Sequence, residues 1–141
     1  MREKTCCFTG HRLIPTNDYQ KIMKCLETEV TKLIHQGVSF FCAGGAFGFD
    51  TLAALTVLKL KPEYLHIRLI LVLPCKEQAA RWSDNDKETY NRILNAADEA
   101  IYTSEHYHSG CMHKRNCYLI DNSSICTTLL LIPLLNDILH Q

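Results

Sequence analysis

Several features that would place a chain in a specialised class are missing from this sequence. It has no run of about 20 apolar residues, so it predicts no membrane-spanning helix. The N-terminus lacks the apolar stretch and cleavage site of a secretory signal, and we therefore expect a cytoplasmic protein. The 15 basic and 15 acidic residues balance, so the basic surplus typical of nucleic-acid-binding proteins is absent. We expect a small-molecule partner, and neither a membrane nor nucleic acid.

Disulfide bonds and a metal centre are also disfavoured, although the chain has eight cysteines. Without a secretory signal the thiols are expected to stay reduced. Four of them fall in apolar, strand-like runs, where a free cysteine behaves as a small hydrophobe; these are Cys6, Cys7, Cys42 and Cys126. Residues 106–117 contain histidines and cysteines, the residue types that most often bind zinc, but their spacing matches no known zinc-binding motif. We expect surface histidines, buried cysteines and no metal among His106, His108, Cys111, His113 and Cys117.

What the sequence does contain is a regular alternation of short apolar runs and amphipathic segments. At 141 residues it is the size of one domain, which we place at 1–141. The predicted strands are 5–8, 38–42, 66–73, 99–103 and 125–132. The predicted helices are 18–36, a segment carrying 52–58 that ends near 61, 84–97 and 111–122. This alternation predicts an α/β fold, a Rossmann-like three-layer sandwich with a mostly parallel sheet of about five strands.

Polar or glycine-rich segments follow the predicted strands, where an open parallel sheet binds its ligands. The strongest is the 44–50 loop, in which Gly44, Gly45 and Gly48 lead from a strand into a helix. Glycines allow close backbone approach, and the helix amides face an anion, so this loop predicts a phosphate site. The alternative is a tight turn that only packs helix on strand. Asp50 is either a ligand contact or a first-turn residue favoured by the helix dipole.

Three further segments supply candidate site residues. After the first strand, Gly10 makes a turn, and Arg12 is suited to bind a phosphate through two N–H groups of its planar guanidinium. His11 is either an acid–base group or a histidine that bonds the backbone. Trp82, with Gln78 and Arg81, either stacks a base or sugar or anchors a helix. Arg115 and Asn116 precede the last strand, and Arg115 adds positive charge to the cleft.

These motifs, taken in order, resemble the YpsA-like family of the SLOG superfamily, which also contains the DprA/Smf proteins and the LOG phosphoribohydrolases. The resemblance covers roughly residues 4–127 and rests on the segments 7–12, 44–51, 73–82 and 110–123. It implies a Rossmann-like, mostly bacterial and cytosolic domain that binds nucleotides or nucleotide-derived ligands. The matching positions are Gly10, Arg12, Gly44, Gly45, Gly48, Asp50, Trp82, Arg115, Asn116 and Asp121.

The sequence departs from this family pattern in two places. The P-G-G-x-G-T-x-x-E signature of the LOG enzymes is missing, so their activity is not carried over. Residues 132–136 are mostly apolar where the family implies a second glycine-rich turn, and we expect a C-terminally shortened sheet. The apolar tail, 134–141, then either covers the sheet or packs on a second copy, which predicts a homodimer detectable by sedimentation.

Four functions remain open at this point. The first is a binding protein or sensor for a nucleotide-type ligand, with the 44–50 loop and Arg12 holding phosphate. The second is an enzyme that acts on a nucleotide glycosidic or phosphate bond, for which the sequence identifies no catalytic residue. The third is a DprA-like single-stranded nucleic-acid binder, and the fourth is a relative that only contacts other proteins. No cofactor is indicated beyond the nucleotide-type ligand itself.

Overall fold

The computed structural model describes residues 4–10, 14–46 and 48–127, and it confirms the predicted alternation of strands and helices. The strands are β1 (Thr5–Phe8), β2 (Phe40–Ala43), β3 (Arg68–Leu73), β4 (Glu99–Tyr102) and β5 (Ile125–Thr127). The helices are α1 (Tyr19–His35), α2 (Phe49–Leu60), α3 (Asp84–Ala96) and α4 (Cys111–Asp121), with a short 3₁₀ turn, η2 (Thr16–Asp18), before α1. Element boundaries differ from the sequence prediction by only one or two residues within these ranges.

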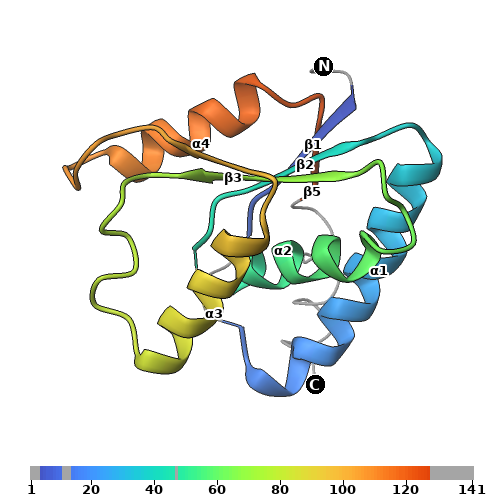
Figure 1. Ribbon diagram of the computed structural model, residues 1–141, viewed down its shortest axis with the longest axis horizontal. Helices are drawn as coiled ribbons and strands as arrows, with labels where there is room; N and C mark the ends of the chain where they lie inside the picture. The colour runs from blue at the N-terminus through green and yellow to red at the C-terminus, as the bar shows by residue number, and fades with distance from the viewer. Residues whose placement is uncertain (1–3, 11–13, 47, 128–141) are drawn as a thin grey trace, which may run out of the picture.

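All five strands described here are parallel and form one sheet in the order β4-β3-β2-β1-β5. The chain moves outward from β1 to β4 and then returns to place β5 on the other side of β1. Right-handed crossovers therefore put α1, α2 and α3 on one face and α4 on the other. Figure 1 shows α4 above the sheet and the three remaining helices below it. This is the expected α/β, Rossmann-like three-layer architecture.

The central strands form because their residues are apolar on both faces of the sheet. The RLILVL sequence of β3 lies between β2 and β4, and its last three residues are fully covered. In α1, apolar residues at helical spacing form a single buried stripe, which consists of Ile22, Leu26, Val30, Leu33 and Ile34. At the start of α3, the Ser83 hydroxyl caps the helix by accepting the Asp86 amide N–H at 3.2 Å.

The two faces of the sheet differ greatly in how much apolar surface they cover. The face under α1, α2 and α3 holds most of the core, including Phe8, Phe41 and Phe49. The α4 face has a much smaller buried cluster of Cys7, Cys42, Val72 and Leu119. Burial raises the pKa of Cys7 and that of Cys42 to about 12, so both thiols stay protonated and behave as apolar side chains.

Several sequence predictions require correction or fall outside the described residues. Cys126 is exposed, against our expectation, because it lies in β5 at the edge of the sheet described here. Cys117 is also exposed, whereas Cys111 is buried as predicted. Within the described ranges, no helix has the length and apolar character needed to cross a membrane. The strand beyond Thr127, the apolar tail and the C-terminal shortening lie outside the described residues.

Candidate functional site

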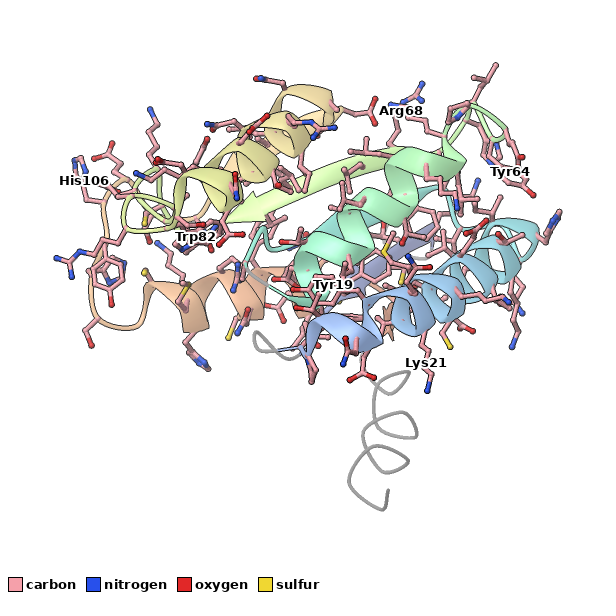
Figure 2. The ribbon with its side chains drawn as sticks, turned by 90° about the horizontal axis from the view of Figure 1, so that it is seen from below. Tyr19, Lys21, Tyr64, Arg68, Trp82 and His106 are labelled. Carbon is pink, nitrogen blue, oxygen red and sulfur yellow. The ribbon has the colours of Figure 1, made fainter. Side chains whose placement is uncertain are left out.

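The strand order reverses between β1 and β5, and the loops after the strands meet at the carboxyl edge of the sheet. In α/β proteins with open parallel sheets, ligands bind at this edge near the reversal point. Figure 2 shows Trp82 and His106, which follow β3 and β4, at one end of the molecule. Arg68, which begins β3, and Tyr64, in the connection before it, lie at the opposite end. The edge that carries the predicted site residues is thus separate from the edge where the strands begin.

Arg115 connects the glycine loop after β2 to α4, 71 residues later in the chain. Its side chain is only 4% exposed, and its Nη1 donates a 2.6 Å hydrogen bond to the Gly44 carbonyl. Its Nε donates to the Asn116 Oδ1 at 2.7 Å. A Cβ at position 44 would lie 2.4 Å from Arg115 Nη1 and 2.9 Å from Asp50 Oδ2. Glycine is therefore required at position 44, because the guanidinium and the carboxylate both approach its Cα.

The same loop is closed from within by the first turn of α2. The buried carboxylate of Asp50 accepts the Ala46 amide N–H at 3.3 Å, and the Thr51 hydroxyl donates to the Ala46 carbonyl at 2.9 Å. Gly48 is the N-cap of α2, with a φ of 75° and no side-chain cap. Asp50 therefore has a structural role in the first turn of α2, where its carboxylate holds the Ala46 amide. A contact between Asp50 and a ligand stays a prediction.

Two other glycines of the edge allow close packing. A Cβ on Gly10 would come within 2.5 Å of the Phe49 ring, so the loop after β1 lies directly against the start of α2. Gly45 has a φ of 74°, and a Cβ there would lie 2.5 Å from Leu73. These contacts bring the ends of β1, β2 and β3 together around α2. His11 and Arg12 lie outside the described residues.

A hollow of about 510 Å³ opens between the segment that follows β3 and the start of α4. One of its lining residues, Gln78, reaches the glycine loop, because a Cβ added to Gly45 would lie 3.3 Å from Gln78 Nε2. Its lining combines aromatic, apolar and polar side chains, namely Cys75, Glu77, Gln78, Ala80, Arg81, Trp82, Tyr107 and Met112. Trp82 also makes an edge-to-face contact with Tyr90, with ring centroids 5.3 Å apart. Trp82 thus has the anchoring role that the sequence gave as one alternative, and it also lines the hollow; its stacking on a base or sugar stays a prediction. The volume suits a ligand of nucleotide size.

A second hollow of about 560 Å³ lies next to the first, beyond the end of β4. Its lining includes Lys76, Tyr102, His106 and Lys114. His106 Nδ1 lies 2.8 Å from Glu77 Oε1, and this hydrogen bond is the main reason why the pKa of Glu77 lies below its ordinary value. Because Glu77 lines the first hollow and His106 the second, the pair forms part of the wall between them.

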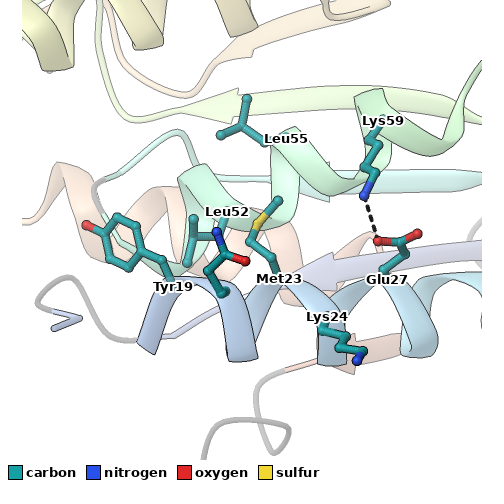
Figure 3. A pocket seen from close by; sticks show the side chains of 8 residues that line it. Tyr19, Met23, Lys24, Glu27, Leu52, Leu55 and Lys59 are labelled. Atoms are coloured by element: carbon teal, nitrogen blue, oxygen red, sulfur yellow. Dashed lines mark hydrogen bonds and ion pairs between the residues drawn. The ribbon is translucent and has the colours of Figure 1, made fainter. Parts of the chain in front are cut away.

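A third hollow, of about 490 Å³, lies away from this edge in the groove between α1 and α2 (Figure 3). It is lined by Met23, Leu52 and Leu55 together with the Lys59–Glu27 ion pair, whose charged atoms are 3.0 Å apart. None of the site residues predicted from the sequence lines this groove. It therefore has a weaker claim to be the functional site than the carboxyl edge.

The structure brings most of the predicted site residues together, and it adds some that the sequence did not indicate. Gly44, Gly45, Gly48, Asp50 and Arg115 form one connected unit. Asn116 supports Arg115, while Gly10 and Trp82 border the unit. Glu77, Tyr107 and Met112 were missed. Only their position after predicted strands could have indicated them. Among the described residues no group of histidines, cysteines or carboxylates is arranged to hold a metal, and His113 contacts only Cys117 in the cluster, at 3.5 Å.

Comparisons with known proteins agree with this architecture. The most similar relatives include UPF0398 protein BH1768 of Halalkalibacterium halodurans, 33% identical over 104 residues, which cover 72% of this chain and 55% of that protein. SPbeta prophage-derived protein YoqJ of Bacillus subtilis is 36% identical over 115 residues, which cover 73% of this chain and 66% of that protein. The chain thus spans less than two thirds of the length of these relatives.

Solved structures with the same fold include DNA processing protein A from two bacteria. The Helicobacter pylori protein, which binds single-stranded DNA, aligns with a TM-score of 0.56 and 19% sequence identity. The alignment covers 86% of this chain and 51% of the Helicobacter pylori chain. The Streptococcus pneumoniae protein aligns with a TM-score of 0.57 and 15% identity, over 86% of this chain and 39% of its own. The family model described as the YspA SLOG family matches residues 8–131, which include the glycine loop, Trp82 and Arg115. This chain therefore belongs to the YspA SLOG family.

Proposed function

We propose that the protein binds a nucleotide or nucleotide-derived ligand along the carboxyl edge of the sheet. The observation that carries this proposal is the 510 Å³ hollow, whose lining residue Gln78 lies against Gly45 of the glycine loop. Met112 lines the hollow, and its Sδ lies 4.0 Å from Arg115 Nη2, while Arg115 holds the carbonyl of Gly44. One ligand of nucleotide size can therefore reach both the hollow and the loop.

The phosphate end of the ligand is assigned to the start of α2. Gly48 leaves this helix without a side-chain cap, and the helix dipole places partial positive charge there. The buried guanidinium of Arg115 adds a full positive charge behind the loop. Arg12 is proposed as a further phosphate contact on the sequence pattern alone, because it lies outside the described residues.

The ring end of the ligand is assigned to the hollow. Trp82 and Tyr107 offer planar faces on which a base can stack, and stacking of this kind accepts any flat heterocycle. Arg81 is exposed at the rim, where it can contact a sugar or a second phosphate. These residues favour a nucleotide over inorganic phosphate or a simple sugar phosphate.

A single-stranded nucleic acid is the second candidate because the Helicobacter pylori neighbour binds single-stranded DNA. This chain has equal numbers of acidic and basic residues, which weakens that candidate, since most of the affinity for nucleic acid comes from phosphate neutralisation. We therefore favour the small ligand. An oligonucleotide belongs in the same experiment as a competing probe.

Thermal unfolding with a panel of nucleotides, dinucleotides, nucleotide sugars and a short DNA strand tests the proposal. A ligand at 100 times its dissociation constant stabilises the fold by about 2.7 kcal/mol, which raises the midpoint by about 5–10 °C. We expect the shift to shrink in Arg81→Ala at the rim and to persist in Arg92→Ala, an exposed arginine on α3 away from the hollow. If no member of the panel shifts the unfolding midpoint, the proposal is contradicted. Incubation with a nucleotide that binds, followed by product analysis, then tests whether the protein is an enzyme.

A further inference from the structure

The side chain of Gln78 carries a buried amide without a hydrogen-bond partner. Its Nε2 and Oε1 atoms are both covered, and neither meets hydrogen-bond geometry with any described residue. Native proteins pair nearly all of their buried polar groups, because an unpaired one loses its hydration without compensation. A donor and an acceptor left unpaired on the same side chain therefore require an explanation.

Tyr90 is the neighbour that could have paired with this amide. Burial raises the pKa of the Tyr90 hydroxyl, and a hydrogen-bonding interaction with the Gln78 side chain offsets part of that rise. The two side chains are thus neighbours, but the contact between them falls short of the distance and angle of a formed hydrogen bond. Tyr90 is held instead by its edge-to-face contact with Trp82. Within the part of the chain that is described, the Gln78 amide therefore has this weak contact with Tyr90 and no fully formed hydrogen bond.

The position of this amide connects the two ends of the proposed ligand site. Gln78 lines the hollow together with Trp82 and Tyr107. On its other side, a Cβ added to Gly45 would lie 3.3 Å from Gln78 Nε2, so the bare Cα of the glycine loop leaves room beside the amide. The amide therefore stands between the aromatic hollow and the loop assigned to phosphate, which is where the edge of a stacked base would pass.

We infer that Gln78 reads the hydrogen-bonding edge of a nucleobase that stacks in the hollow. A carboxamide presents a donor and an acceptor side by side, and nucleobases present the complementary pair in the plane of the ring. Sugars offer hydroxyls but no planar edge to align with an aromatic face. This inference rests on the proposed function and specifies the chemistry of the ligand, a nucleotide bound through its base as well as its phosphate.

The amide is covered in the ligand-free protein, so the ligand must draw it outward on binding. Gln78 lies in the stretch between β3 and α3, where residues 74–83 form turns and bends and no helix or strand. Rotation of a glutamine side chain there breaks no ladder of backbone hydrogen bonds. Ligand binding then removes the unfavourable burial of the amide and supplies the partners that it lacks.

The first arm of the test measures stability without ligand. Methionine has nearly the shape of glutamine but no amide, so Gln78→Met is expected to raise the unfolding midpoint by about 3 °C or more. Tyr90→Phe is the control. If the two side chains act independently, the change in unfolding midpoint of the double variant equals the sum of the changes in the two single variants. A lower midpoint in Gln78→Met, with strong coupling to Tyr90→Phe, would show that the amide is a structural partner of Tyr90 and would overturn the inference.

The second arm compares ligands with and without a base. The probes are the four nucleoside monophosphates and ribose 5-phosphate, titrated calorimetrically into the wild type and Gln78→Met. We expect at least one nucleotide to bind more tightly than ribose 5-phosphate and to lose about tenfold or more in affinity in Gln78→Met, while ribose 5-phosphate is unaffected.

The outcomes of this titration separate the inference from the proposed function. Equal nucleotide affinity in the two proteins overturns the role of Gln78 but leaves the proposed function intact. Equal binding of ribose 5-phosphate and every nucleotide also overturns the inference, because the base then contributes nothing. If the wild type binds none of the probes and no other nucleotide, the proposed function fails and the inference fails with it.

Discussion

Two neighbouring loops at the carboxyl edge of the sheet are built in opposite ways. The 44–48 loop after β2 is fixed by several polar contacts, from Arg115 to Gly44 and from Asp50 and Thr51 to Ala46. The 74–83 loop after β3 carries an unpartnered buried amide on Gln78 and an exposed Arg81. The fold therefore fixes Gly44 and Ala46 of the first loop. The second has polar groups that the fold does not use, as expected of a loop that contacts a ligand.

This contrast predicts that substitutions in the first loop mainly affect stability and that those in the second mainly affect binding. The largest expected effect is that of Gly44→Ala. Its new Cβ would overlap Arg115 and Asp50, which are both buried, and we expect a loss of about 3 kcal/mol in the free energy of unfolding. Denaturant unfolding measures this loss.

Gly110→Ala is the control for this substitution. Gly110 has a φ of 87° and no heavy atom within 4 Å of an added Cβ, so it tests backbone strain without overlap. We expect it to cost about 1 kcal/mol. Gly44 has no positive φ, so its loss comes from crowding, and equal losses in the two variants would show that this crowding costs far less than expected.

The next largest effect is expected for Asp50→Ala. Removal of a buried carboxylate that accepts the Ala46 amide should cost about 2 kcal/mol, against about 1 kcal/mol for Thr51→Val, which removes a neutral hydrogen bond to the same residue. Both values come from denaturant unfolding of the ligand-free protein. If Asp50→Ala is as stable as the wild type but fails to bind nucleotide, Asp50 is a ligand contact and the assignment of the loop is wrong.

Substitution of Arg81 in the second loop should give the reverse result. Arg81→Ala is expected to change the free energy of unfolding by less than about 0.5 kcal/mol, because the side chain is exposed, and to weaken nucleotide binding. Thermal unfolding with and without nucleotide measures both quantities on one sample. A large loss of stability with unchanged binding would remove the distinction between the loops.

The smallest expected effect is a change in the pKa of Glu77 when His106, its partner in the wall between the two hollows, is replaced. The hydrogen bond from His106 lowers the pKa of Glu77, so His106→Ala should move that pKa back toward its ordinary value. A depressed carboxyl pKa stabilises the fold above the unfolded-state pKa, and the contribution disappears as the pH falls through the folded-state pKa. Carboxyl NMR titrations of both proteins check this. An unchanged Glu77 pKa would show that the pair is not formed in solution.

The sequence predicted the scaffold well because local patterns determine it. The nearly continuous apolar run of β3 indicated a strand covered on both faces, and Gly44, Gly45 and Gly48 indicated a loop between a strand and a helix. These signals come from neighbouring residues, and the sheet needs little more to be recognised.

The contacts that complete the site could not be predicted in the same way. Arg115 reaches Gly44 across 71 residues, and Glu77 meets His106 across 29. Such pairs depend on which loops become neighbours once the strand order is established. Cys126 was grouped with the cysteines that behave as small hydrophobes because its run is apolar, but its exposure depends on the edge position of β5.

The central claim, that a nucleotide-type ligand occupies the hollow beside the glycine loop, is tested most directly by tryptophan fluorescence. Trp82 is the only tryptophan in the chain and lines this hollow, so its emission reports on the surroundings of that side chain. We predict a saturable change in emission on titration with a nucleotide, with weaker binding in Arg81→Ala than in Arg92→Ala. Unchanged emission with every nucleotide at millimolar concentration, together with an unshifted unfolding midpoint, would contradict the account.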